Sequence, residues 1–239
     1  MRFPKKLKDA ITSFGLGKAV WRIIRGFYVK YICLTPCKRL QKYGKSAIHE
    51  VHTLLTSANL PYFADYGTLL GIVRDNGFIK NDDDIDFTVP PDAPSPVKYF
   101  EVLSKSQKLV FCSGFEYQGR ITELTYSFKG IPVDLFFSVI EDGTIYNYAY
   151  EYVHNSPDWI PYREMRRVNG CYEVRIFKGC EVVIPKDFDE ILTTKYGTWR
   201  VPLDFASVGR NVVTEGLVPR EYTKGFARKV DARRIKEIG

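Results

Sequence analysis

The sequence predicts an α+β protein, in which a mixed sheet is flanked by helices and preceded by a basic helical extension. Two observations favour this class. Short β-type runs at 84–89 and 132–140 alternate with segments of helical periodicity, such as 46–58. The 239 residues are 45% hydrophobic and 26% charged, which is enough apolar material for a core and excludes a wholly disordered chain.

The formal net charge of +7 is unevenly distributed. Residues 1–45 hold 12 Lys/Arg and one acid, whereas residues 46–195 hold 14 basic and 22 acidic residues. Residues 196–239 are again basic, with nine Lys/Arg and five acids. A pI near 9.0 by itself suggests a nucleic-acid partner. Because the body of the chain is acidic, we expect no nucleic-acid partner and look for another use of the basic ends.

The first segment, residues 5–43, has a basic helical pattern. Apolar side chains such as Ile23, Ile24 and Phe27 recur at helical spacing, with arginines and lysines between them. Two interpretations remain open. The segment either lies on an anionic membrane surface, or it packs on the domain with its basic groups reaching into water.

Cysteine usage and hydropathy indicate the compartment. The chain has five cysteines without a CxxC pair, which favours reduced thiols. It has no run of 18 apolar residues and no signal-peptide pattern at its start. We therefore expect a cytoplasmic protein, and peripheral association at the inner face of the membrane if residues 1–45 bind lipid.

The elements expected after residue 45 follow from periodicity and turn residues. The helix at 46–58 has Ser46 as its expected N-cap. Next come a strand at 62–65, a short helix at 67–74, a turn at Asn76-Gly77, and a strand at 84–89 that Pro90 stops. Then follow a helix at 97–109, strands at 121–128 and 132–140 joined by a turn at Lys129-Gly130, strands at 145–150 and 172–177, and a helix at 187–196.

Four carboxylates crowd the start of strand 84–89 and the two residues before it: Asp82, Asp83, Asp84 and Asp86. Their mutual repulsion, and the poor strand propensity of Asp, call for an offsetting partner such as a divalent cation. Side chains alternate along a strand, so Asp84 and Asp86 share one face while Ile85 points into the core. The alternative is a solvated acidic loop that binds no ion.

A further carboxylate, Asp134, stands alone in the apolar strand at 132–140. A lone Asp there is costly unless it is paired or ligated. We predict that it joins Asp84 and Asp86 across the sheet, which would form a three-carboxylate site for Mg²⁺ or Mn²⁺.

A strand-to-helix turn at Gly67 and Thr68 precedes the acidic run. Gly67 would let the backbone approach a phosphate, and Thr68 would donate its hydroxyl to it. Arg74, six residues later, either contacts phosphate or pairs with an Asp. The order Gly-Thr, Asp-x-Asp, distal Asp is that of the nucleotidyltransferase superfamily, in which metals bridge a diphosphate during in-line attack.

Two further groups have competing interpretations. Arg163, Arg166 and Arg167 are either a second anion site or, as favoured, solvated surface. The aromatic residues within 146–162 would stack on a sugar, cage a choline cation or, as favoured, form an aromatic core.

At these residues the chain resembles the LicD family of bacterial phosphocholine transferases, with fukutin and fukutin-related protein as distant relatives. The family pattern is approximately G-G-T-L-L-G-x-x-R-x-x-G-F-I-P-W-D-D-D-I-D, and this chain reads Y-G-T-L-L-G-I-V-R-D-N-G-F-I-K-N-D-D-D-I-D from Tyr66 to Asp86. The departures are Tyr66 and the pair Lys80-Asn81. A late signature at Pro185, Asp187, Leu192 and Tyr196-Gly197 extends the resemblance over about residues 46–202.

The resemblance implies a nucleotidyltransferase-like catalytic domain at 46–202, between the extension at 1–45 and a basic extension at 203–239. It also implies transfer of phosphocholine or a phospho-alditol from a CDP-linked donor (CDP-choline, CDP-ribitol or CDP-glycerol). The acceptor would be a hydroxyl of a cell-surface glycan or glycolipid, such as lipopolysaccharide or capsule polysaccharide, and CMP would leave. The alternatives are nucleotidyl transfer from a nucleoside triphosphate and a membrane-bound, non-catalytic adaptor.

Overall fold

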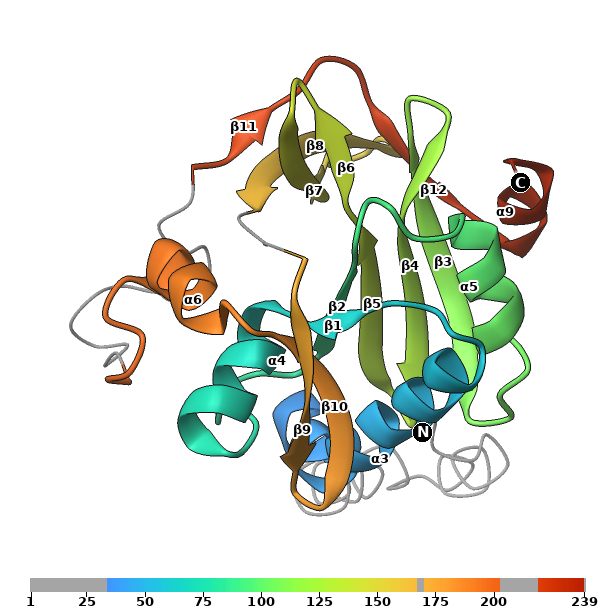
Figure 1. Cartoon of the computed structure of the whole chain (residues 1–239). Helices are drawn as coiled ribbons and strands as arrows, with labels where there is room; N and C mark the ends of the chain where they lie inside the picture. Colours follow the sequence, from blue (N-terminus) through green and yellow to red (C-terminus); the bar gives the residue numbers. More distant parts are fainter. Residues whose placement is uncertain (1–33, 167–169, 203–218, 239) are drawn as a thin grey trace, which may run out of the picture.

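The computed structural model describes residues 34–166, 170–202 and 219–238 (Figure 1). The predicted α+β class is confirmed, because helices surround a large mixed sheet. The helical segments are α3 (Pro36–Ser57), α4 (Tyr66–Leu70), the π-helix η2 (Gly71–Asp75), α5 (Pro96–Leu103), α6 (Phe188–Tyr196) and α9 (Ala232–Ile238). The strands are β1 (Phe63–Ala64), β2 (Ile85–Val89), β3 (Leu109–Tyr117), β4 (Arg120–Phe128), β5 (Ile131–Phe137), β6 (Val139–Glu141), β7 (Thr144–Tyr152), β8 (Asp158–Arg166), β9 (Tyr172–Phe177), β10 (Cys180–Pro185), β11 (Glu221–Tyr222) and β12 (Ala227–Val230).

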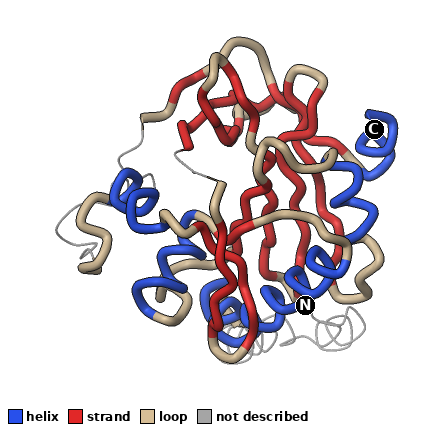
Figure 2. The backbone as a smooth tube through the Cα atoms, viewed as in Figure 1, coloured by secondary structure: helices blue, strands red, loops and turns tan. Residues whose placement is uncertain are grey.

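The main sheet runs in the order β1-β2-β5-β4-β3-β12-β8-β7-β6, with β11 also paired to β8. Strands β2 and β5 are parallel, and the other pairs are antiparallel. Strands β9 and β10 form a separate hairpin beside β1 and α3. Figure 2 shows the strands as a curled red surface with the helices along its lower and outer sides. The parallel pair is the part of this sheet that positions the candidate site.

The main core lies between the sheet and a row of three helices, α3, α5 and α9. These helices contact β5, β4 and β3, and each contacts the next in the row. Alternate residues of the central strands, including Ile85, Leu124 and Leu135, are fully buried there. Because side chains alternate along a strand, the residues between them face the opposite side of the sheet. That opposite side carries Asp86 and Asp134.

The first helix of the described chain begins ten residues before its predicted start. Thr35 is its N-cap and Pro36 its first residue, so the prediction of Ser46 as N-cap is wrong. The apolar stripe continues upstream through Leu40 and Gly44, and both are buried. Gly44 lets the Phe78 ring pack against the helix, since a Cβ would lie 2.5 Å from that ring. The helix thus crosses the expected boundary at residue 45, and residues 1–33 lie outside the described part.

Other boundaries differ for local reasons. The helix predicted at 97–109 ends at Leu103, because Ser106 forms a turn by accepting the N–H groups of Lys108 and Leu109. Strand β8, Asp158–Arg166, was not expected, since it contains Pro161. The turn at Lys129-Gly130 is confirmed, with φ angles of 51° and 81°.

The described end of the chain belongs to the sheet rather than to a separate extension. Strand β12, within the segment predicted as an extension (203–239), pairs with β3 on one side and β8 on the other. Ile235 of α9 is fully buried in the main core. Residues 203–218 lie outside the described part of the chain.

The aromatic residues of 146–162 contribute to a second, smaller core, as favoured. Tyr148 is buried with Phe115 and Tyr117, and Trp159 packs edge-on against Phe115. This cluster fills the space between β3, β7, β8 and β12. Within the described ranges no helix combines the length and the apolar character needed to cross a bilayer.

Candidate active site

The parallel strands β2 and β5 bring three carboxylates together. Asp86 stands directly opposite Asp134 in the register, and Asp84 immediately precedes β2. One carboxylate oxygen from each lies within 4.8 Å of the others. The neighbours Ile85 and Phe87 are fully buried on the other face, as the alternation predicted. The geometry therefore unites the three residues that the sequence proposed as metal ligands.

These carboxylates are held in an unfavourable electrostatic setting. Burial, together with repulsion from Asp84 and Asp134, raises the pKa of Asp86 well above its usual range. Burial and the charge of Asp84 raise the pKa of Asp134 to about 7. The Oδ1 atom of Asp134 is buried without a hydrogen-bond partner. A hard divalent cation prefers an all-oxygen set of this kind and would supply the missing partner, so the residues fit Mg²⁺ or Mn²⁺.

A fourth carboxylate, Asp82, extends the acidic group. Asp82, Asp83 and Asp84 also place carboxylate oxygens within 4.8 Å of one another. Burial and the proximity of Asp84 raise the pKa of Asp82 to about 8. Asp82 was predicted as part of the acidic run but not as a ligand, because loop side chains have no alternation to predict their direction.

Helix α4 begins next to the carboxylates. The Asp65 side chain caps it by accepting the Tyr66 N–H at 2.8 Å. Gly67 faces Asp82 so closely that a Cβ would lie 2.8 Å from the Asp82 Oδ2. The Thr68 hydroxyl is buried and accepts the Asp86 N–H at 2.9 Å. The structure thus gives Thr68 a contact with the carboxylate strand, and donation of its hydroxyl to a phosphate stays a prediction.

Arg74 takes one of the two partners considered for it. Its Nε and Nη2 donate to the two carboxylate oxygens of Asp75, each at 2.8 Å. It lies in the π-helix η2, six residues after Thr68. Of the two alternatives, the structure thus shows Arg74 paired with an Asp. Phosphate binding by Arg74 stays a prediction.

Of the three arginines near 163–167, the two that the structure describes, Arg163 and Arg166, are not the solvated surface that was favoured. Arg166 is buried and forms an ion pair with the buried Asp65. Arg163 pairs with Glu141 and Glu221 at the sheet edge. Arg167 lies outside the described residues.

A second buried ion pair joins Lys195 to Glu164. Asp65 and both ion pairs were not predicted from the sequence, because partners more than 30 residues apart leave no local pattern.

Glu123 is a further residue that the sequence reasoning missed. It stands two positions before Thr125, which is opposite Asp134, so it lies on the same face of the sheet. Its side chain accepts the Thr125 hydroxyl, and burial with the charge of Asp134 raises its pKa to about 8. The sequence does carry a pattern that could have predicted Glu123, because this residue occupies a polar position in a strand of alternating character.

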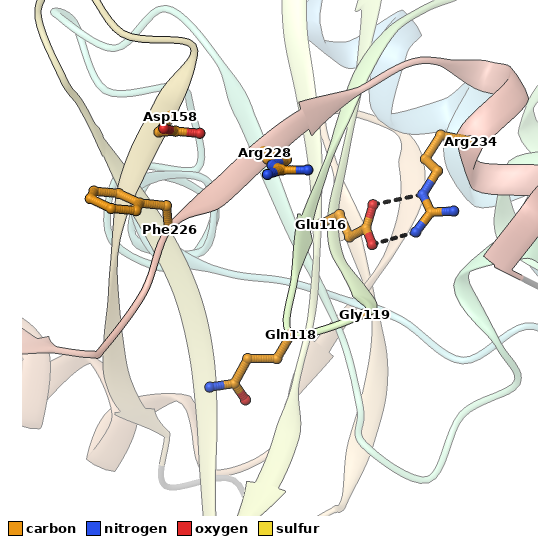
Figure 3. A pocket seen from close by; sticks show the side chains of 7 residues that line it. All are labelled: Glu116, Gln118, Gly119, Asp158, Phe226, Arg228 and Arg234. Carbon is orange, nitrogen blue, oxygen red and sulfur yellow. Dashed lines mark hydrogen bonds and ion pairs between the residues drawn. The ribbon is translucent and has the colours of Figure 1, made fainter.

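A pocket of about 400 Å³ lies elsewhere, on the side of the sheet where α9 packs (Figure 3). Its lining residues are Glu116, Gln118, Gly119, Asp158, Phe226, Arg228 and Arg234. Glu116 and Arg234 are joined there by two hydrogen bonds of 2.7 and 2.8 Å. None of the predicted site residues lines this pocket, so the chemistry is better placed at the carboxylates.

The comparison with protein families agrees with this site. The LicD/FKTN/FKRP nucleotidyltransferase domain matches residues 59–187, more than half of the chain. The chain belongs to the LicD/FKTN/FKRP family. The match contains the α4 turn and the three carboxylates, and it confirms the nucleotidyltransferase-type domain predicted from the motifs.

Individual relatives of this LicD domain are distant. An uncharacterized protein of Rickettsia prowazekii (strain Madrid E) is 30% identical over 105 residues, covering 40% of this chain and 38% of that protein. The chain thus spans about two fifths of that relative's length.

Two solved structures of the antibiotic-resistance factor ANT(2'')-Ia are also similar to part of the chain. The crystal structure in complex with adenylyl-2''-tobramycin is 17% identical, with a TM-score of 0.35, and covers 59% of this chain and 68% of that one. The solution structure is 16% identical, with a TM-score of 0.38, and covers 61% and 66%. Similarity at this level carries no detail of the site.

Proposed function

We propose that this LicD-family protein transfers phosphocholine or a phospho-alditol from a CDP-linked donor to a hydroxyl of a cell-surface glycan or glycolipid, with release of CMP. The observation that carries the proposal is the cluster of Asp84, Asp86 and Asp134, whose oxygens lie within 4.8 Å of one another in a family transferase domain. Three half-buried acids whose oxygens lie so close together have no evident use except to hold a cation.

The carboxylates of Asp84, Asp86 and Asp134 would hold Mg²⁺ or Mn²⁺. When bound, the cation would neutralise the donor diphosphate and stabilise CMP as it leaves. Gly67 has no side chain, and the Asp82 carboxylate lies 2.8 Å from where its Cβ would be. The Gly67 backbone would accept a phosphate at the start of α4, as the sequence predicts. The Thr68 hydroxyl accepts the Asp86 N–H and so joins the start of α4 to strand β2.

The proposed reaction needs a group that accepts a proton. In the donor, one of the two phosphorus atoms carries the alcohol, and the acceptor hydroxyl oxygen forms a bond to that phosphorus. The bond from the same phosphorus to the CMP oxygen breaks. The hydroxyl proton passes to the carboxylate of Asp134 or of Asp84.

The test is to incubate the protein with Mn²⁺, candidate glycans, and CDP-choline, CDP-ribitol or CDP-glycerol, and to measure CMP. We expect CMP from one donor and at least a hundredfold loss in Asp84→Asn. Asp142→Asn is the matched control, because Asp142 is an exposed acid in the turn between β6 and β7. No CMP from any donor, or equal rates in wild type and Asp84→Asn, would refute the proposal.

The same assay separates the alternatives. Release of pyrophosphate from a nucleoside triphosphate, without CMP from a CDP-conjugate, would indicate nucleotidyl transfer. Failure of the wild-type protein to bind Mn²⁺ would indicate a non-catalytic adaptor.

We further propose that the basic N-terminal segment associates with anionic membrane surfaces. The test removes residues 1–33 rather than 1–45, because α3 begins at Pro36 and buries Leu40 in the core. We expect the shortened protein to lose co-sedimentation with phosphatidylglycerol vesicles and to keep its affinity for Mn²⁺. Equal co-sedimentation of the two proteins would contradict this proposal.

A further inference from the structure

Tyr66 has an unusual backbone at a critical place. Its φ is 49°, in the left-handed region that bulky residues rarely occupy. It is the first residue of α4 and directly precedes Gly67 and Thr68, which contact the acidic residues. A conformation of this kind persists only when the surroundings hold it.

The side chain of Tyr66 shows what holds it. The guanidinium carbon of Arg166 lies 4.7 Å from the centre of its ring, and the Lys195 Nζ lies 4.5 Å from it. Phe136 packs on the same ring, with 5.2 Å between ring centres. The Tyr66 hydroxyl accepts a hydrogen bond of 3.1 Å from the Asn147 amide. Two cations, one ring and one amide therefore fix this side chain.

Both cations are themselves held in place. Arg166 pairs with Asp65, and Lys195 pairs with Glu164, so the four charges balance. All four side chains are buried. They come from β8, from α6 and from the residue that caps α4, whereas the carboxylates lie on β2 and β5. The arrangement ties two distant elements to the start of α4.

The start of α4 in turn contacts the carboxylates. Thr68 accepts the Asp86 N–H, and Gly67 fits against the Asp82 carboxylate with no room for a Cβ. A relaxation of Tyr66 to negative φ would change the direction in which the chain enters Gly67. Both contacts depend on that direction.

We propose that Tyr66 is a positioning residue: its ring, clamped by Arg166 and Lys195, holds the Gly67-Thr68 turn against the carboxylates that bind the divalent cation. The inference rests on the proposed metal-dependent function. It assigns a role to the buried ion pairs, which the proposed reaction does not otherwise use. Loss of the clamp should therefore weaken cation binding in a protein that is still folded.

The test measures Mn²⁺ affinity by titration calorimetry, with circular dichroism to confirm folding. Tyr66→Gly removes the ring and tolerates the positive φ, and it should weaken Mn²⁺ binding about tenfold, as loss of outer-shell support does. Tyr66→Phe keeps the clamped ring and should stay within about twofold of wild type. Tyr126→Phe is the matched control, since it removes a buried tyrosine hydroxyl on the opposite face of the sheet.

A second variant keeps the test decisive if Tyr66→Gly does not fold. Lys195→Met combined with Glu164→Gln removes one side of the clamp and leaves no unpaired buried charge. It should also weaken Mn²⁺ binding several-fold. Wild-type affinity in folded Tyr66→Gly, or in the double variant if Tyr66→Gly does not fold, would overturn the positioning role, even if the Tm falls. Absence of Mn²⁺ binding in the wild-type protein would instead overturn the proposed function, and the positioning role with it.

Discussion

Replacing Asp134 by Asn should stabilise the metal-free protein, although it removes a proposed ligand. Burial and the charge of Asp84 raise the pKa of Asp134 from 3.8 to about 7. The folded state therefore holds this proton more tightly than the unfolded state, and ionisation costs stability. The cost is absent below pH 3.8, grows as the pH rises, and is complete above pH 7. The Asn side chain stays neutral throughout.

The size of the effect follows from the pKa. A rise of about three units corresponds to roughly 4 kcal/mol at pH 8. The neighbouring acids share this repulsion, and Asp134 keeps part of its surface exposed, so we expect about half, or about 2 kcal/mol. For a protein of this size that is a gain in Tm of about 4–8 °C for Asp134→Asn at pH 8, and almost none at pH 4.

Mn²⁺ should reverse the order of stability. At one hundred times its dissociation constant, a ligand that binds only the folded state adds about 2.7 kcal/mol. The wild-type Tm should then rise by about 5–10 °C, whereas that of Asp134→Asn should barely move. Thermal unfolding at pH 4 and pH 8, with and without Mn²⁺, measures all of these values. A lower Tm for metal-free Asp134→Asn at pH 8, or equal Mn²⁺ shifts in both proteins, would refute the reasoning.

Two further predictions follow from the geometry. Mn²⁺ affinity should rise between pH 6 and pH 8, because Asp134, with a pKa of about 7, must lose its proton before it binds a cation. Loss of the proton of Asp82, whose pKa is about 8, adds a negative charge beside the site in the same range. Titration calorimetry across this range checks it, and a flat profile would count against it. Gly71→Ala should destabilise the fold by about 1–3 kcal/mol, because its Cβ would lie 2.5 Å from the Gly77 carbonyl oxygen. A urea midpoint equal to that of wild type would show that the backbone can yield there.

Much of the site could be predicted because its signals are local. The alternation around Ile85 predicted that Asp84 and Asp86 share a face, and the lone Asp134 in an apolar strand indicated a polar partner. The roles of Thr68 and Arg166 could not be predicted in this way. Thr68 accepts a bond from an N–H 18 residues away, and Arg166 pairs with an acid 101 residues away. Such contacts depend on which distant segments pack together in the fold, and the periodicity of a single segment carries no information about that.

The sequence by itself determined the fold class, the family resemblance and the three acids, because strand alternation, turn residues and an ordered motif are properties of neighbouring residues. Only the tertiary structure decided that β2 and β5 are parallel and place Asp86 opposite Asp134. It also decided that the end of the chain completes the sheet, and that two buried ion pairs enclose Tyr66. The physical reason is that strand pairing and charge burial are settled between segments far apart in the chain, where packing and desolvation outweigh local preference.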